Sequence, residues 1–184
     1  MVGILQALCE DHANMSKLLD AFERQLAVFE RAEVPDHDIL SGVIEYCLAY
    51  PDLYHHPKED LLIAKLSERD PGRLTTIRNL RQEHLELGAL TRRLAAADRH
   101  VRLGAELPRE SFSALAREFV DLYRRHMDSE ERLLFAGAVE TLTPDDWAAI
   151  ERDAVAAAGP LFGPTYDRRF EILRNSVLAW DGCR

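Results

Sequence analysis

Two segments of the sequence pair a histidine with a glutamate four residues later: His55 with Glu59, and His126 with Glu130. On a helix, residues four apart lie on one face with Cβ atoms about 5–6 Å apart, so both side chains of a pair can reach one metal centre. Imidazole and carboxylate ligands without thiolates are typical of iron, manganese or zinc sites. The two pairs are therefore candidate metal ligands.

These pairs, and the single histidines His12 and His84, lie on apolar stripes with helical spacing. Apolar residues recur at intervals of three and four through almost the whole chain, and strand signals are nearly absent. The stripes are Leu5, Leu8, His12, Met15, Leu19, Phe22, Leu26 and Phe29; His55, Glu59, Leu62 and Leu66; Ile77, Leu80, His84, Leu87 and Leu94; and Phe112, Leu115, Phe119, Leu122, His126 and Leu133, with Glu130 one turn after His126. We therefore expect all six ligand-type residues to point into a core.

The elements that must position them are four long helices, predicted at residues 3–31, 36–69, 72–103 and 108–140. Pro51 and Pro57 should kink or locally break the second. Short connections force neighbours to be antiparallel, so the prediction is an all-α, up-down-up-down four-helix bundle over residues 1–142. Thr143 and Pro144 are typical of a helix start, predicting a fifth helix to Ala158. With a loop at 159–164 and a last helix at 166–178, residues 143–184 form a C-terminal helical extension packed on the bundle.

The four histidines should also lie at one height. Measured from the bundle end that holds Arg31, Asp36, Leu103 and Pro108, each lies 18 or 19 residues along its helix. A lone histidine on an apolar stripe is more often a satisfied core residue than a ligand, and a buried glutamate can be held by Arg or Lys. Six such residues at one height favour a joint metal site instead.

The number of candidate ligands favours two ions. A structural zinc ion takes about four ligands, whereas six candidates converge here. A carboxylate can bridge two ions through its two oxygens. Two octahedral ions offer about twelve positions, of which two bridging carboxylates and a shared oxo or hydroxo group take about six. Four or five histidines then leave a position open for a small ligand such as dioxygen or nitric oxide.

Residues 5 to 140 resemble the hemerythrin, or HHE cation-binding, family, whose four metal-ligand motifs appear in order. They are matched by Glu10-Asp11-His12, His55-His56-Pro57-Lys58-Glu59-Asp60, Gln82-Glu83-His84 and His126-Met127-Asp128-Ser129-Glu130-Glu131. Pro160-Leu161-Phe162-Gly163 also resembles a tail common in bacterial members. The resemblance implies two iron ions, oxo- or hydroxo-bridged, with terminal ligands His12, His55, His84 and His126 and bridges Glu59 and Glu130.

One departure from the oxygen-carrying members concerns the third helix, which in those proteins supplies two histidines one turn apart. At that spacing His84 has Leu80 and Gly88 as neighbours. His56, beside His55, is either the fifth imidazole or an exposed or hydrogen-bonding residue. The departure weighs against stable, reversible dioxygen carriage.

Three classes of function follow. The leading hypothesis is a binding protein whose di-iron centre binds or senses dioxygen, nitric oxide or iron itself. The enzymatic alternative is nitric-oxide or peroxide chemistry or iron–sulfur repair, and the third alternative is a metal-free helical interaction protein. The Glu-x-x-His signature of ferritin-like oxidases is missing, because the residues three before the histidines are Cys9, Asp52, Arg81 and Tyr123.

The amino-acid composition limits the kinds of partner that we expect the protein to bind. The 184 residues include 47% hydrophobic and 30% charged residues, with a formal net charge of −9, which argues against a nucleic-acid partner. No apolar run is long enough to span a bilayer and no signal peptide is evident, so we expect no membrane partner and a cytoplasmic location. Cys9, Cys47 and Cys183 are widely spaced and predict neither disulfides nor a thiolate site. A homodimer is left open.

Overall fold

The computed structural model describes residues 3–104, 107–157 and 164–182, and these residues contain helices and no strand. The all-α prediction is confirmed. The elements are α1 (Gly3–Glu30), α2 (His37–Tyr50), η1 (Pro51–His55), α3 (His56–Arg69), η2 (Pro71–Arg73), α4 (Leu74–Arg102), α5 (Arg109–Ser129), η3 (Glu130–Phe135), α6 (Ala136–Thr141), α7 (Pro144–Ala157) and α8 (Pro164–Gly182).

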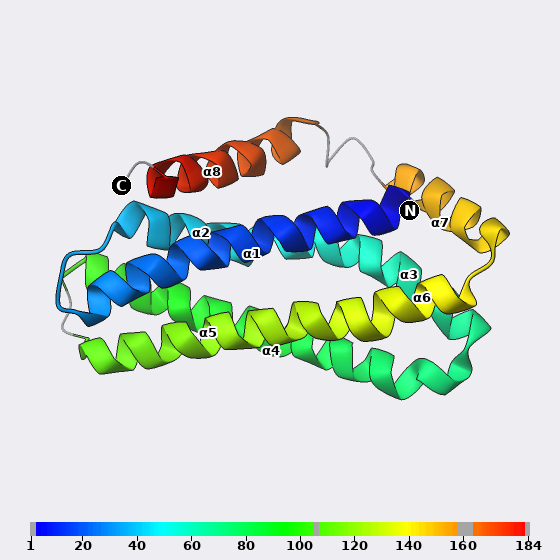
Figure 1. Cartoon of the computed structure of the whole chain (residues 1–184), viewed down its shortest axis with the longest axis horizontal. Coiled ribbons are helices and arrows are strands. Elements are labelled where there is room, and N and C mark those ends of the chain that lie inside the picture. Colours follow the sequence, from blue (N-terminus) through cyan, green and yellow to red (C-terminus); the bar gives the residue numbers. More distant parts are fainter. Residues whose placement is uncertain (1–2, 105–106, 158–163, 183–184) are drawn as a thin grey trace.

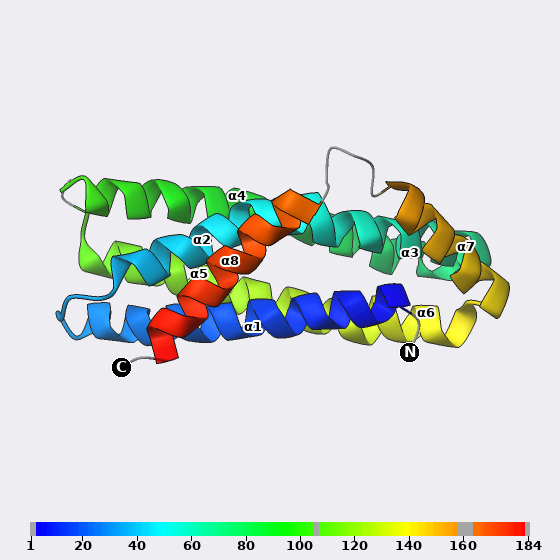
Figure 2. The same cartoon turned by 90° about the horizontal axis from the view of Figure 1, so that it is seen from above.

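The long helical segments lie side by side as rods (Figures 1 and 2). The first rod is α1, the second is α2 continued by α3, the third is α4, and the fourth is α5 continued by α6. α7 contacts α3 and α1 at one end, and α8 crosses α2 and α1 obliquely. Within the described part of the chain, no helix is long and apolar enough to cross a membrane.

The helix α8 packs closely on α2. A Cβ atom on Gly42 would lie 2.8 Å from Cγ2 of Val177, so the glycine allows the two helices to approach. α8 starts before the predicted residue 166 and ends after 178. The predicted end at Ala158 and the loop residues 159–163 lie outside the described residues.

A polar layer divides the apolar core into two clusters. One cluster holds Met15, Leu87 and Met127, and the other holds Leu8 and Leu80, with further members in each. His12 on α1 and His84 on α4 fall between members of the two clusters, and Glu130 falls between Met127 and Leu134. The prediction of one common height is consistent with this arrangement.

Two π-helical turns interrupt the α-helical hydrogen bonding beside this layer. In η1 the N–H of His56 donates to the carbonyl of Pro51, five residues back rather than four. Proline has no N–H and crowds the preceding turn, so Pro51 and Pro57 favour a local break that does not end the helix. The predicted break in the second helix is therefore present as a π turn.

The other π turn, η3, overturns one predicted core position. Leu133 is 42% exposed, whereas Leu134 and Phe135 are buried. The N–H of Ala136 donates to the carbonyl of Glu131, again five residues back. A π turn holds one residue more than an α turn, which moves the inward position from Leu133 to Leu134.

The start of α7 is fixed by reciprocal hydrogen bonds and an ion pair. The Thr143 hydroxyl accepts from the N–H of Asp146 at 3.3 Å, and the Asp146 carboxylate accepts from the N–H of Thr143 at 3.0 Å. Arg69 of α3 donates to both oxygens of Asp146, at 3.0 and 2.8 Å. The predicted helix start at Thr143 and Pro144 is confirmed. Arg69 and Thr143 together hold the pKa of Asp146 well below its usual range.

Asp146→Asn is expected to destabilise the metal-free protein at neutral pH, and the difference should shrink as the pH falls below about 4. The folded-state pKa is depressed, so the charge stabilises the fold above the unfolded-state value of about 3.9 and this contribution is lost as the pH falls towards the folded-state value. Urea unfolding of both proteins from about pH 7 to about pH 3 measures the difference. A difference that does not change with pH would contradict the prediction.

Candidate metal centre

The predicted ligand residues converge in the middle of the bundle. Glu59 and Glu130 are 0% exposed. The other buried members are His12, His55 and His126. The side chains of His84 and His56 are 16% and 19% exposed. Burial of both carboxylates agrees with the stripes, and His56 lies with the other histidines rather than in solvent.

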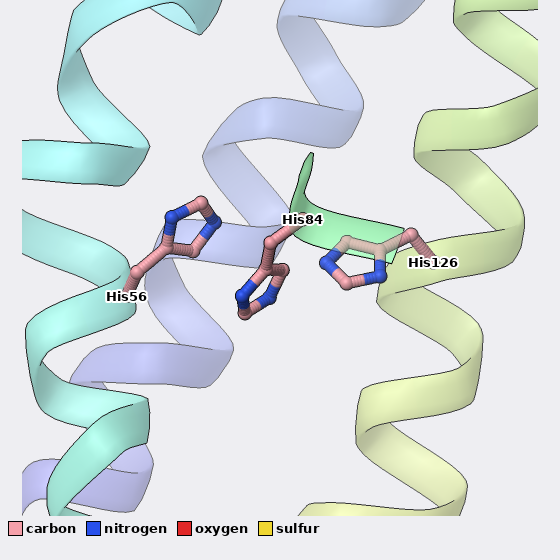
Figure 3. Close-up of side chains that lie close together, drawn as sticks. All are labelled: His56, His84 and His126. Atoms are coloured by element: carbon pink, nitrogen blue, oxygen red, sulfur yellow. The ribbon is translucent and has the colours of Figure 1, made fainter. Parts of the chain in front are cut away.

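The seven residues form two groups of potential metal ligands, and in each group the ligand atoms lie within 4.8 Å of one another. Figure 3 shows His56, His84 and His126, from α3, α4 and α5, with the His84 ring between the other two. The His56 and His84 rings stack with centroids 3.9 Å apart. We call these three residues group 2. Group 1 consists of His12, His55, Glu59 and Glu130.

Each glutamate turns one oxygen towards histidines of group 1 and the other towards group 2. Oε1 of Glu59 lies 3.4 Å from Nε2 of His55, and its Oε2 lies 3.4 Å from Nε2 of His84. Oε2 of Glu130 lies 3.3 Å from Nε2 of His12. Its Oε1 lies 2.9 Å from Nε2 of both His84 and His126. This is the arrangement required of two carboxylates that bridge a pair of ions.

The spacing of the donor atoms is also that of ligands around a cation. Both oxygens of Glu59 are buried without a hydrogen-bond partner, which is costly for a carboxylate. Nε2 of His12 and Nε2 of His55 face each other at 3.1 Å. Two nitrogens bound at right angles to one ion, each about 2.1 Å from it, would lie about 3 Å apart.

The metal-free site balances its charges through protons. Burial and the charge of Glu130 raise the pKa of Glu59. Burial opposes ionisation of Glu130 too, but the close imidazoles of His12, His126 and His84 outweigh it and hold the pKa of Glu130 well below its usual range. Burial lowers the pKa of His55, but the charge of Glu59 and a hydrogen bond to Asp11 outweigh burial and raise that pKa to about 10. Cations would replace these protons as the partners of the carboxylates.

Four of the five histidines direct Nδ1 to a carboxylate outside the cluster, which leaves Nε2 facing inward. The Nδ1–oxygen pairs are His12–Glu131 at 2.9 Å, His55–Asp11 at 3.2 Å, His56–Asp52 at 3.0 Å and His126–Glu83 at 3.0 Å. Carboxylates in this position fix the ring orientation of metal-binding histidines and make them better ligands. Every Nδ1 partner in these pairs is acidic.

The stripes alone did not assign these outer acids. Asp11, Glu83 and Glu131 directly adjoin a predicted ligand in sequence, and Asp52 lies four residues before His56. Adjacent residues differ by about 100° around a helix, so the first three fall off the inward stripes. Adjacency to a predicted ligand in the sequence could have identified these acids. It could not have identified the histidine that each acid contacts. Asp11 supports His55 of another rod rather than its neighbour in the chain.

Fold and site together define a helical protein with a buried histidine and glutamate cluster able to hold a metal cation. The family model described as the hemerythrin HHE cation-binding domain matches residues 3–138. The chain therefore belongs to the hemerythrin HHE family. No significant match was found among curated proteins or among solved structures.

Asp11→Asn is expected to weaken metal binding by about 10- to 100-fold. Asp11 accepts from His55 Nδ1, from the Tyr50 hydroxyl at 2.6 Å and from Lys58 Nζ at 2.9 Å. The amide keeps the shape but removes the charge that orients His55. Competition with a chelator of known affinity measures the change, and Glu10→Gln, an exposed neighbour bonded to Gln6, is the matched control. Equal affinities for the two variants would contradict this role.

Proposed function

We propose that this chain is a di-iron protein of the hemerythrin type, built as an up-down-up-down four-helix bundle, that binds a small ligand such as dioxygen or nitric oxide. One ion would be held by His12 and His55, and the other by His84, His126 and His56. Glu59 and Glu130 would be shared by the two ions. Residues 1–142 form the bundle, and residues 143–184 form a helical extension on it.

The observation that carries this proposal is that the two oxygens of each glutamate face different groups of imidazoles. A single ion would need only one oxygen from each glutamate. A metal-free interaction bundle would leave both oxygens of Glu59 buried without a hydrogen bond, at a cost that an apolar residue would avoid. Two ions would give all four oxygens a partner.

The protein's own residues would hold and orient the centre. The carboxylates place negative charge between the ions, and the outer acids keep the imidazole Nε2 atoms pointed inward. When bound, iron would supply an open coordination position and redox chemistry for a diatomic ligand. A cavity of about 30 Å³ adjoins His56, His84 and His126, room for roughly one or two water-sized molecules.

Anaerobic loading with ferrous iron is expected to give close to two iron ions per chain, and Glu59→Gln should lower this to well below one. A bridge contributes to both ions, so its loss should remove them together rather than leave one. In the metal-free protein the variant should be no less stable, because the glutamate oxygens have no hydrogen bond to lose. Iron analysis and urea unfolding measure the two effects.

Glu130→Gln should lose iron in the same cooperative way, whereas Glu86→Gln, an exposed residue of α4 bonded to Gln82, should keep it. A wild-type value near zero would remove the proposal. A value near one would support a mononuclear site. If Glu59→Gln kept full iron but lost stability, the carboxylate would be structural.

His55→Ala is expected to reduce iron occupancy more than His56→Ala. The His55 side chain is 2% exposed and its supporting Asp11 carboxylate is 9% exposed, whereas the corresponding values for His56 and Asp52 are 19% and 72%. A ligand held by a solvated acid contributes less to preorganisation. Iron per chain after identical loading and desalting checks the ranking, and equal losses would show it to be wrong.

A further inference from the structure

The cavity beside the metal centre is lined both by residues of that centre and by residues exposed on the surface of the bundle. All three histidines of group 2 line it, together with His55 and Glu130 of group 1, whereas His12 and Glu59 do not. A small molecule in this cavity therefore meets the whole of group 2 but only part of group 1. Figure 3 shows how close the rings of this group lie.

The exposed lining residues mark the opening. They are Leu48 on α2, Asp52 on η1 and Arg92 on α4. Gly88, one turn before Arg92, also lines the cavity, and its missing side chain leaves space that the arginine covers. A Cβ atom on Gly88 would lie 3.3 Å from Nη1 of Arg92. We call Leu48, Asp52, Gly88 and Arg92 the portal.

The charges at the portal favour an anion. The guanidinium of Arg92 forms no ion pair with a carboxylate of the described residues and lies against Gly88 of the lining. The Asp52 carboxylate keeps its negative charge, but it is 72% exposed, where solvent screens it, and it accepts from Nδ1 of His56 at 3.0 Å. Elsewhere the chain is acidic, with a net charge of −9, and would repel a small anion. An unpaired guanidinium at the opening of a narrow cavity focuses the field at that point.

We propose that the portal is the route by which small ligands reach the metal centre from the group 2 side, and that Arg92 selectively speeds the entry of small anions, while neutral diatomic molecules enter at a rate that does not depend on it. This inference rests on the proposed metal centre. It concerns the access of a small linear or bent anion, the class that includes azide and nitrite.

The test compares azide, a small anion, with nitric oxide, a neutral molecule, on the iron-loaded protein. Arg92→Gln is expected to slow azide association on the order of tenfold and to weaken its dependence on ionic strength, because the steering charge is lost. The rate for nitric oxide should not change. Arg93→Gln is the matched control, since Arg93 is an exposed neighbour that does not line the cavity. Stopped-flow absorption gives the rates, and iron analysis verifies loading.

Gly88→Leu tests the route separately from the charge. The new side chain would displace the Arg92 guanidinium and fill the opening, so the rates for azide and nitric oxide should both fall. Ala89→Leu, on an exposed neighbouring position of α4, should change neither rate.

The outcomes separate the two proposals. If Arg92→Gln and Arg93→Gln slow azide equally, or if neither does, in protein that holds two iron ions, Arg92 is not selective and this inference falls alone. Unchanged rates in Gly88→Leu would place the route elsewhere. Wild-type protein that takes up no metal would overturn the proposed function and this inference with it.

Discussion

Two glutamate side chains buried at the centre of a helical bundle impose the constraint on which the rest of the structure depends. Removing a carboxylate from water costs several kcal/mol unless positive charge and hydrogen bonds compensate it. Glu59 and Glu130 are 0% exposed, and the residues around them are imidazoles. These imidazoles are held in turn by acids nearer the surface. The centre is thus layered, with carboxylates inside, histidines around them and carboxylates outside, and this alternation suits a site whose compensating charge comes from cations.

The bundle can present this layer because its helices are locally irregular. The π turns η1 and η3 lie at the level of the centre, one ending at His55 and the other beginning at Glu130. Each adds one residue to a helical turn and so changes the direction in which the later side chains of the helix point. At η1 the result is that two consecutive histidines, His55 and His56, both reach the centre, although an undistorted helix would separate them by about 100°. His56 then stacks on His84, the only histidine that α4 contributes to either ligand group.

The C-terminal helix α8, outside the residues that the family model matches, joins the bundle close to the centre. Phe170 is 1% exposed and packs edge-on against Tyr50, with ring centroids 5.6 Å apart. The Tyr50 hydroxyl donates to Asp11, and Asp11 accepts from His55. Packing of α8 and orientation of a candidate ligand therefore share one set of contacts. The extension thus contributes to the environment of the site as well as to the core.

Helical periodicity, a local property of the sequence, determined the helices, the polar layer and the residues that form it. The stripes place His12, His55, Glu59, His84, His126 and Glu130 in the core. Only the tertiary structure decided how these side chains face one another, because that depends on the rotation of each helix against its neighbours. It directs the two oxygens of each carboxylate towards different groups of histidines, pairs Asp11 with His55 across the bundle, and brings His56 against His84. It also moves the inward position from Leu133 to Leu134, since a π turn depends on packing that apolar spacing does not encode.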